Sequence, residues 1–113
     1  MSKASVAKTT VKVADVRELE NGKGKVVRVG GMTLAIFRIG DEFFALDNFC
    51  LHRGGPLGEG EIDGYNLTCP WHGWTYDVRD GSFEIIPPLK VRTYPVRREG
   101  ETILVELDGG KAG

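Results

Sequence analysis

The residues best suited to chemistry are gathered between Cys50 and His72. The chain contains two cysteines and two histidines, which form the pairs Cys50-x-His52 and Cys69-x-x-His72. Thiolate and imidazole are the side chains that soft and borderline metals prefer. Two such pairs, separated by sixteen residues, therefore predict a metal site built from two loops.

The order of the ligand types distinguishes two kinds of metal centre. A structural zinc finger usually groups a cysteine pair and then a histidine pair. Here each loop supplies one cysteine and one histidine, which suits a two-iron centre whose cysteines bind one iron and whose histidines bind the other. The candidate ligands are Cys50, His52, Cys69 and His72. A mononuclear zinc site with these four ligands is the alternative.

The sequence around these residues resembles the two cluster-binding loops of Rieske-type ferredoxins. The segments CLHRGGPL and CPWHGWTYD carry the resemblance, which runs from about Phe43 to Pro88. It implies one [2Fe-2S] cluster per chain, bound by the four residues named above. A disulfide is not expected, because each cysteine is paired with a histidine at fixed spacing.

The same loops also resemble those of membrane-complex Rieske proteins, with informative departures. Those proteins carry an additional cysteine in each loop, joined as a disulfide, where this chain has Gly55 and Trp71. They have a serine donor to sulfur where this chain has Trp74, whereas Tyr76 matches their sulfur-binding tyrosine. Hydrogen bonds to sulfur stabilise the reduced cluster. The loss of one donor therefore implies a lower reduction potential.

Other residues near the ligands have both a structural and a functional interpretation. Glycines crowd the first loop, and their backbone N–H groups could approach a sulfide closely because no Cβ intervenes. These glycines are Gly54, Gly55, Gly58 and Gly60. Nearby aromatic residues are expected to pack in the core rather than to conduct electrons. These aromatics are Phe49, Tyr65, Trp71 and Trp74.

Glycine-containing turns separate short β-rich runs along the chain. Before the Cys/His stretch the runs are 25–29, 32–39 and 42–47. Their links, Gly30-Gly31 and Gly40-Asp41, are hairpin signals. Apolar residues on both faces of 34–39 predict a strand buried between layers.

Further strands are predicted within and after the Cys/His stretch. Turn signals at Asp63-Gly64 and Asp80-Gly81 predict short strands near 65–69 and 74–78. A last hairpin is expected from 91–97 and 102–107.

These patterns predict an all-β fold, and the resemblance implies a Rieske-like antiparallel β-barrel or sandwich with an inserted cluster-binding subdomain. At 113 residues the chain is expected to be a single Rieske [2Fe-2S] domain, 1–113. The basal β part would comprise about 9–47 and 89–108. The cluster-binding insert would comprise about 48–88.

Composition narrows the range of partners. The net charge of −1 indicates no general attraction to nucleic acid. No apolar run reaches membrane-spanning length, and MSKASVAKTT lacks the apolar stretch of a secretory signal. We therefore expect a cytoplasmic protein with no membrane partner.

The resemblance implies a soluble one-electron carrier, a ferredoxin that passes electrons from a reductase, expected to be flavin-dependent, to a terminal oxygenase. The alternative is the small Rieske subunit of an assimilatory nitrite reductase or a similar multi-subunit oxidoreductase. The chain is not expected to be an enzyme itself. Rieske oxygenases need a separate iron bound by two histidines and a carboxylate, and both histidines are already assigned.

Overall fold

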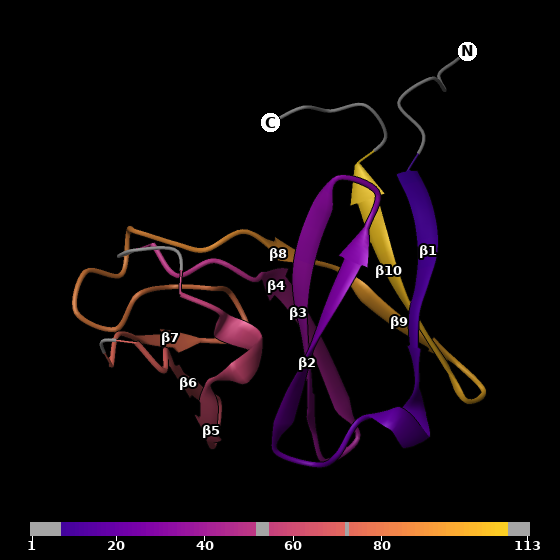
Figure 1. Ribbon diagram of the computed structural model, residues 1–113, viewed down its shortest axis with the longest axis horizontal. Coiled ribbons are helices and arrows are strands. Elements are labelled where there is room, and N and C mark those ends of the chain that lie inside the picture. Colours follow the sequence, from indigo (N-terminus) through magenta and orange to yellow (C-terminus); the bar gives the residue numbers. More distant parts are fainter. Residues whose placement is uncertain (1–7, 52–54, 72, 109–113) are drawn as a thin grey trace.

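The computed structural model describes residues 8–51, 55–71 and 73–108. These residues form short strands in three antiparallel sheets (Figure 1). The predicted all-β antiparallel fold is confirmed. No helix in the described segments is both long and apolar enough to cross a membrane.

Two of the sheets form the part of the molecule that we call the base. The first sheet has the order β1 (Lys8–Asp15), β10 (Thr102–Asp108) and β9 (Val96–Glu99). The second sheet has the order β2 (Lys23–Val29), β3 (Met32–Ile39), β4 (Glu42–Asp47) and β8 (Thr93–Tyr94). A single 3-10 turn, η1 (Val16–Glu18), follows β1.

The predicted hairpins of the second sheet are confirmed. Gly30 and Gly40 link β2 to β3 and β3 to β4, with φ values of 60° and 63°. A residue with a Cβ rarely adopts a positive φ, which explains the glycines at these two turns.

The third sheet belongs to the segment between β4 and β8. Its order is β5 (Glu61–Asp63), β6 (Asn66–Thr68) and β7 (Thr75–Asp77). A second 3-10 turn, η2 (Leu57–Glu59), precedes it. We call residues 48–88 the insert. Figure 1 shows the three short strands to one side of the longer strands of the base.

Strand β3 is buried on both faces, as its apolar pattern predicts. Leu34 and Ile36 lie in the core between the two sheets of the base. Ala35 and Phe37 lie in a second core that is shared with the insert and contains both cysteines. All four β3 side chains are 0% exposed. Burial of each large apolar side chain contributes about 1.5–3 kcal/mol, so this strand joins the base firmly to the insert.

The expected last hairpin is present as β9 and β10, but the expectation that 91–97 forms one strand is wrong. Residues 93–94 form β8 and pair with β4, whereas 96–99 form β9 and pair with β10. Pro95 separates the two strands. Proline has no N–H to donate to a sheet, and here the chain passes from one sheet to the other at this residue.

Glycines allow η2 of the insert to approach β2 of the base closely. A Cβ at Gly58 would lie 2.5 Å from Val26 Cγ2, and one at Gly24 would lie 2.7 Å from the Gly58 carbonyl oxygen. The Gly58 N–H donates to the side-chain oxygen of buried Asn48 at 2.7 Å. Asn48 directly follows β4, so the start of the insert is fixed to η2.

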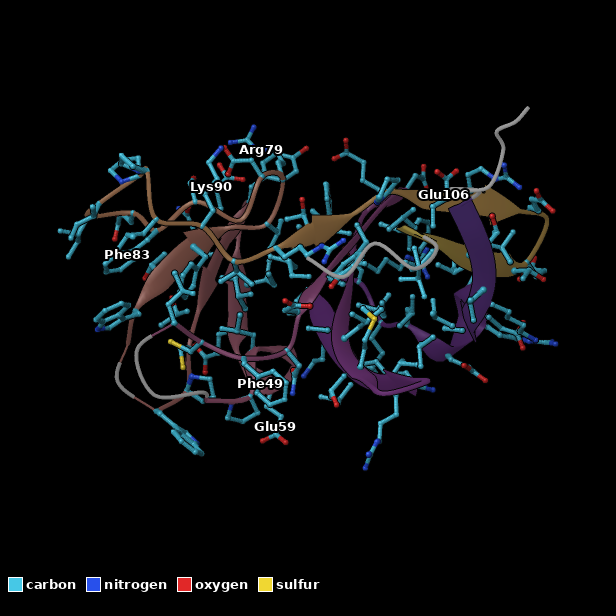
Figure 2. The ribbon with its side chains drawn as sticks, turned by 90° about the horizontal axis from the view of Figure 1, so that it is seen from above. Phe49, Glu59, Arg79, Phe83, Lys90 and Glu106 are labelled. Atoms are coloured by element: carbon cyan, nitrogen blue, oxygen red, sulfur yellow. The ribbon has the colours of Figure 1, made fainter. Side chains whose placement is uncertain are left out.

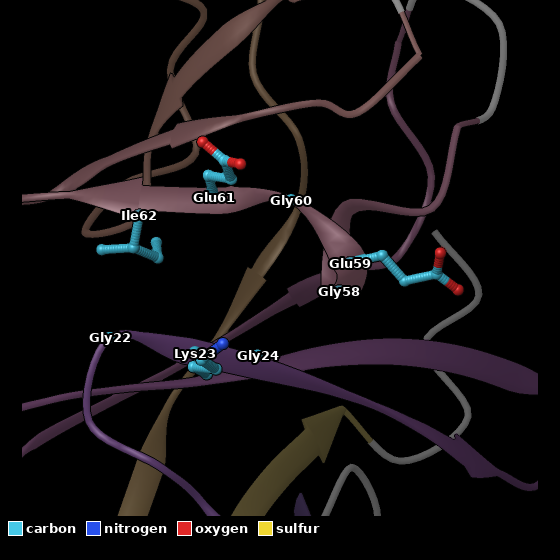
Figure 3. Close-up of a pocket in the computed structure, with 8 residues that line it drawn as sticks. All are labelled: Gly22, Lys23, Gly24, Gly58, Glu59, Gly60, Glu61 and Ile62. Atoms are coloured by element: carbon cyan, nitrogen blue, oxygen red, sulfur yellow. The ribbon is translucent and has the colours of Figure 1, made fainter.

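Beside this contact lies an open groove between β2 and the η2–β5 segment (Figure 3). Its volume is about 590 Å³. Ile62 of β5 points across the groove toward β2 (Figure 3). The lining residues are Gly22, Lys23, Gly24, Gly58, Glu59, Gly60, Glu61 and Ile62. They include no cysteine, histidine or aromatic side chain, so the groove supplies none of the ligands that a soft metal prefers.

The contact at Gly58 predicts a measurable effect on stability. Gly58→Ala should lower the free energy of unfolding by about 1–3 kcal/mol, because the new methyl group would overlap Val26 and displace η2. Denaturant titration followed by circular dichroism measures this change. Gly31→Ala is the matched control, because a Cβ there has nothing within 4 Å. Equal stabilities of the two variants would contradict a close contact at Gly58.

Candidate metal centre

The two cysteines lie in two short loops of the insert. Cys50 is 3% exposed, and its N–H donates to the carbonyl of Gly55 at 2.9 Å. Cys69, 2% exposed, directly follows β6. Its N–H donates to the Trp74 carbonyl at 2.8 Å, and its own carbonyl accepts the Gly73 N–H at 3.1 Å. Backbone hydrogen bonds therefore fix the positions of both cysteines.

Gly55 brings the two loops together. Its carbonyl accepts the N–H of Cys50, and a Cβ placed on it would lie 2.8 Å from Cys69 Sγ. The same Cβ would lie 3.1 Å from the indole ring of Trp71. The two cysteines therefore lie on either side of one glycine, without a disulfide between them. Any larger residue at this position would displace the sulfur or the indole.

Gly55 and Trp71 also occupy the positions at which membrane-complex Rieske proteins, by the resemblance, carry the paired cysteines. In this chain the two positions are in contact, and an indole ring lies against the glycine. Packing of the indole on the glycine thus joins the two positions that membrane-complex Rieske proteins join by a disulfide.

Tyr76 supplies a hydrogen bond to one of the sulfurs. Its side chain is 0% exposed, and its hydroxyl lies 3.1 Å from Cys50 Sγ. The same hydroxyl oxygen accepts the N–H of Leu51 at 3.0 Å. Either atom could donate in this contact. A cysteine that binds a metal is a thiolate and can only accept, so with a bound metal the hydroxyl would be the donor to Cys50. Burial is the main cause that raises the pKa of Tyr76, and the hydrogen bond to Cys50 is the second. The phenol therefore keeps its proton at neutral pH.

The predicted histidine ligands, His52 and His72, lie outside the described residues, as do Arg53 and Gly54. The structure therefore brings together the two predicted cysteines and the predicted sulfur donor Tyr76. The neighbours of the two histidines along the chain, Leu51 and Trp71, are 46% and 56% exposed.

Two loop glycines have a different role from the one expected. The N–H groups of Gly58 and Gly60 donate to Asn48 Oδ1 at 2.7 Å and to the Leu57 carbonyl at 2.9 Å. A Cβ on Gly60 would lie 2.4 Å from the Thr68 carbonyl oxygen. Neither N–H is available to a sulfide. These two glycines are required by close packing.

Of the four aromatic residues expected to pack in the core, two do so and two do not. Trp74 and Tyr65 pack against the core that contains the cysteines. Phe49 and Trp71, in contrast, are 52% and 56% exposed. Phe49 lies on the opposite side of the insert from Arg79 and Lys90 (Figure 2). Local sequence could not indicate this exposure, because the core that contains the cysteines also takes side chains from strands far away in the sequence, such as Phe37 and Leu46.

Sequence reasoning missed Phe83, a residue of the same centre. Phe83 is 4% exposed and stacks on Trp74 with ring centroids 4.2 Å apart. It also contacts the ring of Tyr76, at 5.6 Å between centroids. The turn signal at Asp80-Gly81 places Phe83 opposite Tyr76, and this was the available indication.

Comparison with known proteins identifies the family of this centre. The Rieske [2Fe-2S] domain matches residues 9–95. The ferredoxin component of the p-cumate 2,3-dioxygenase system of Pseudomonas putida is 39% identical over 92 residues, covering 75% of this chain and 76% of that protein.

Solved structures give the same result. The ferredoxin of carbazole 1,9a-dioxygenase from Nocardioides aromaticivorans has a TM-score of 0.79 at 32% identity, covering 86% of this chain and 96% of that chain. A chain from a complex of reduced oxygenase and oxidized ferredoxin in carbazole 1,9a-dioxygenase has a TM-score of 0.76 at 31% identity, covering 84% of this chain and 99% of that chain.

The described residues fit the sulfur-bound side of such a cluster. Two buried cysteines flank Gly55, which leaves room for Cys69 Sγ, and a buried hydroxyl is placed to donate to Cys50 Sγ. Thiolates are the protein ligands that iron–sulfur clusters use. The chain therefore belongs to the Rieske [2Fe-2S] family, and its cofactor is a [2Fe-2S] cluster.

Proposed function

We propose that this protein is a ferredoxin that carries single electrons from a reductase to a terminal oxygenase. The structural observation that carries the proposal is the pair of buried cysteines at Gly55, with the Tyr76 hydroxyl 3.1 Å from the sulfur of Cys50. Two of its relatives support it, because they are ferredoxin components of dioxygenase systems. In this role the chain transfers electrons and catalyses no reaction of its own.

We assign the cluster ligands by the pattern of the sequence. Cys50 and Cys69 would bind one iron, and His52 and His72 would bind the other. When bound, the cluster takes up one electron and later releases it. The buried cysteines keep their side of the site away from water. The Tyr76 hydroxyl donates to a sulfur that becomes more negative on reduction, and so favours the reduced state.

The insert, residues 48–88, is proposed as the cluster-binding subdomain, and about 9–47 with 89–108 as its support. Both cysteines, Tyr76 and Phe83 belong to the insert. Two contacts with the base fix its orientation: Tyr65 donates to the Glu42 carboxylate, and its ring packs edge-on against Phe44. A rigid support keeps the ligand loops in place during electron transfer.

The proposed partners are a flavin-dependent reductase as the donor and an oxygenase as the acceptor. Solved structures of carbazole 1,9a-dioxygenase contain its oxygenase and ferredoxin in one complex. The corresponding surface here would be the edge carrying Phe49, Leu51 and Trp71, which expose apolar side chains beside the ligand positions. We place the protein in the cytoplasm, where reduced thiols are maintained.

The first prediction concerns the content of the site. The purified protein should contain about two irons and two acid-labile sulfides per chain, with the low average g-value of a mixed cysteine and histidine cluster in electron paramagnetic resonance. His52→Ala and His72→Ala should each abolish this signal, because the chain has no other imidazole to replace the ligand. A colourless protein that binds one zinc would contradict the assignment.

The second prediction concerns Gly55. Gly55→Ala should strongly reduce cluster content, because the new methyl group would lie 2.8 Å from Cys69 Sγ. A sulfur bound to iron cannot move away as a free side chain can. Iron per chain and visible absorbance measure the effect. Gly31→Ala should retain full cluster content, since its Cβ would enter open space. Full occupancy in Gly55→Ala would show that the cluster does not need this close approach.

The third prediction concerns docking. Leu51→Glu should slow electron transfer to the oxygenase while the cluster content stays unchanged, because Leu51 exposes its side chain beside a ligand position. Glu101→Lys, an exposed change on the β9–β10 hairpin, should have little effect. Stopped-flow oxidation of the reduced ferredoxin measures both. If electron transfer responds to Glu101→Lys alone, docking is on the base. Tight co-purification with a large reductase subunit would favour the alternative function, a small subunit of a multi-subunit reductase.

A further inference from the structure

Three aromatic side chains of the insert, those of Trp74, Tyr76 and Phe83, form one group beside Cys50. Tyr76 is paired with Leu67 on one side and with Phe83 on the other, so these three side chains share one face of the small sheet. Trp74 lies two residues before Tyr76 and reaches the same face, where its ring stacks on Phe83 at 4.2 Å and 8° between planes. Phe83 thus lies against both Trp74 and Tyr76.

The backbone fixes Phe83 to the strand that carries Tyr76. Phe83 N–H donates to the Leu89 carbonyl at 2.9 Å, and Glu84 N–H donates to the Thr75 carbonyl at 2.8 Å. The Asp77 N–H donates to the Ser82 carbonyl at 2.9 Å. Phe83 is therefore bridged to Tyr76 of β7, and Ser82 to Lys90, by isolated antiparallel pairs outside the named strands. Phe83 lies at the end of the insert far from Glu106 (Figure 2).

The Tyr76 ring is confined between Leu67 on one side and Phe83 on the other, both nearly or fully buried. The Tyr76 hydroxyl makes two contacts at once: it accepts the N–H of Leu51 at 3.0 Å and lies 3.1 Å from Cys50 Sγ. Both distances are kept only while the ring stays in this position. Hydrogen bonds weaken steeply when their geometry changes. Extra space beside the ring would let the hydroxyl move off the sulfur.

We propose that Phe83 is a positioning residue for electron transfer: it fixes the Tyr76 hydroxyl on Cys50 Sγ and thereby raises the reduction potential, with Trp74 supporting it from outside. The proposal rests on the proposed function, because it needs a cluster bound through Cys50. It assigns Phe83 no contact with the iron. The effect of Phe83 on the potential passes through the Tyr76 hydroxyl.

A double-mutant cycle on the cluster-loaded protein tests this proposal. The midpoint potential is measured for the unchanged protein, Tyr76→Phe, Phe83→Leu and the double variant. Tyr76→Phe removes the hydroxyl but keeps the ring, and should lower the potential. Phe83→Leu opens space beside the ring and should lower it by a smaller amount. In the Tyr76→Phe background, Phe83→Leu should produce no further shift.

Two additional variants complete the experiment. Phe43→Leu makes the same substitution at a half-buried residue that packs against the core of the base, and it should leave the potential unchanged. Trp74→Leu removes the outer support of Phe83 and should lower the potential slightly, again only when Tyr76 is present. If the Phe83→Leu protein does not bind the cluster, Trp74→Leu provides the test in its place.

Different results overturn different claims. Equal shifts from Phe83→Leu, or from Trp74→Leu, with and without the Tyr76 hydroxyl would show that these residues act by excluding water, and would overturn the positioning role alone. The positioning role would also be overturned if Tyr76→Phe clearly shifts the potential while neither Phe83→Leu nor Trp74→Leu shifts it. An unchanged protein with no [2Fe-2S] signal in electron paramagnetic resonance would overturn the proposed function together with this inference.

Discussion

The two-sided burial of β3 is the constraint on which the rest of the structure depends. Its alternate side chains enter two cores: Leu34 and Ile36 join the sheets of the base, and Ala35 and Phe37 enter the core that contains both cysteines. Neither core could form fully without this strand. The insert is therefore not an appendage on a flexible linker, because its interior is continued by a central strand of the base. The positions of Cys50 and Cys69 are thus set by residues far away in the sequence.

Glycine has two separate structural roles near the centre. Gly30 and Gly40 allow tight turns with positive φ. Gly55 and Gly58 have no positive φ and are required because a sulfur and a valine side chain lie where their Cβ atoms would be. The sequence predicts the first role, since the glycines lie between β-rich runs. It cannot predict the second, because the neighbouring atoms come from other segments of the chain.

The same distinction explains what could be predicted for the fold and the site. The ligand spacing, the hairpins before Asp47 and the buried character of β3 are local patterns, and they were sufficient for the fold class and the family. The exposure of Trp71 and the packing of Phe83 on Trp74 and Tyr76 depend on contacts between segments, which no local pattern contains. Pro95 is an intermediate case: its missing N–H is visible in the sequence, but the change of partner sheet depends on how the two sheets of the base are arranged.

Leu51 combines a backbone contact with the buried centre and an exposed apolar side chain. Its backbone N–H donates to the Tyr76 hydroxyl, which in turn lies on Cys50 Sγ, whereas its side chain is exposed. A change of side chain at this position would therefore test the proposed docking surface while it leaves the backbone hydrogen bond to the Tyr76 hydroxyl in place. Trp71 combines roles in a similar way, because one part of its indole packs on Gly55 while more than half of the side chain faces solvent. Buried hydrogen bonds and exposed apolar contacts thus meet within single residues of the loops. In the proposed complex a partner would contact these exposed side chains, and it need not disturb the buried hydroxyl of Tyr76.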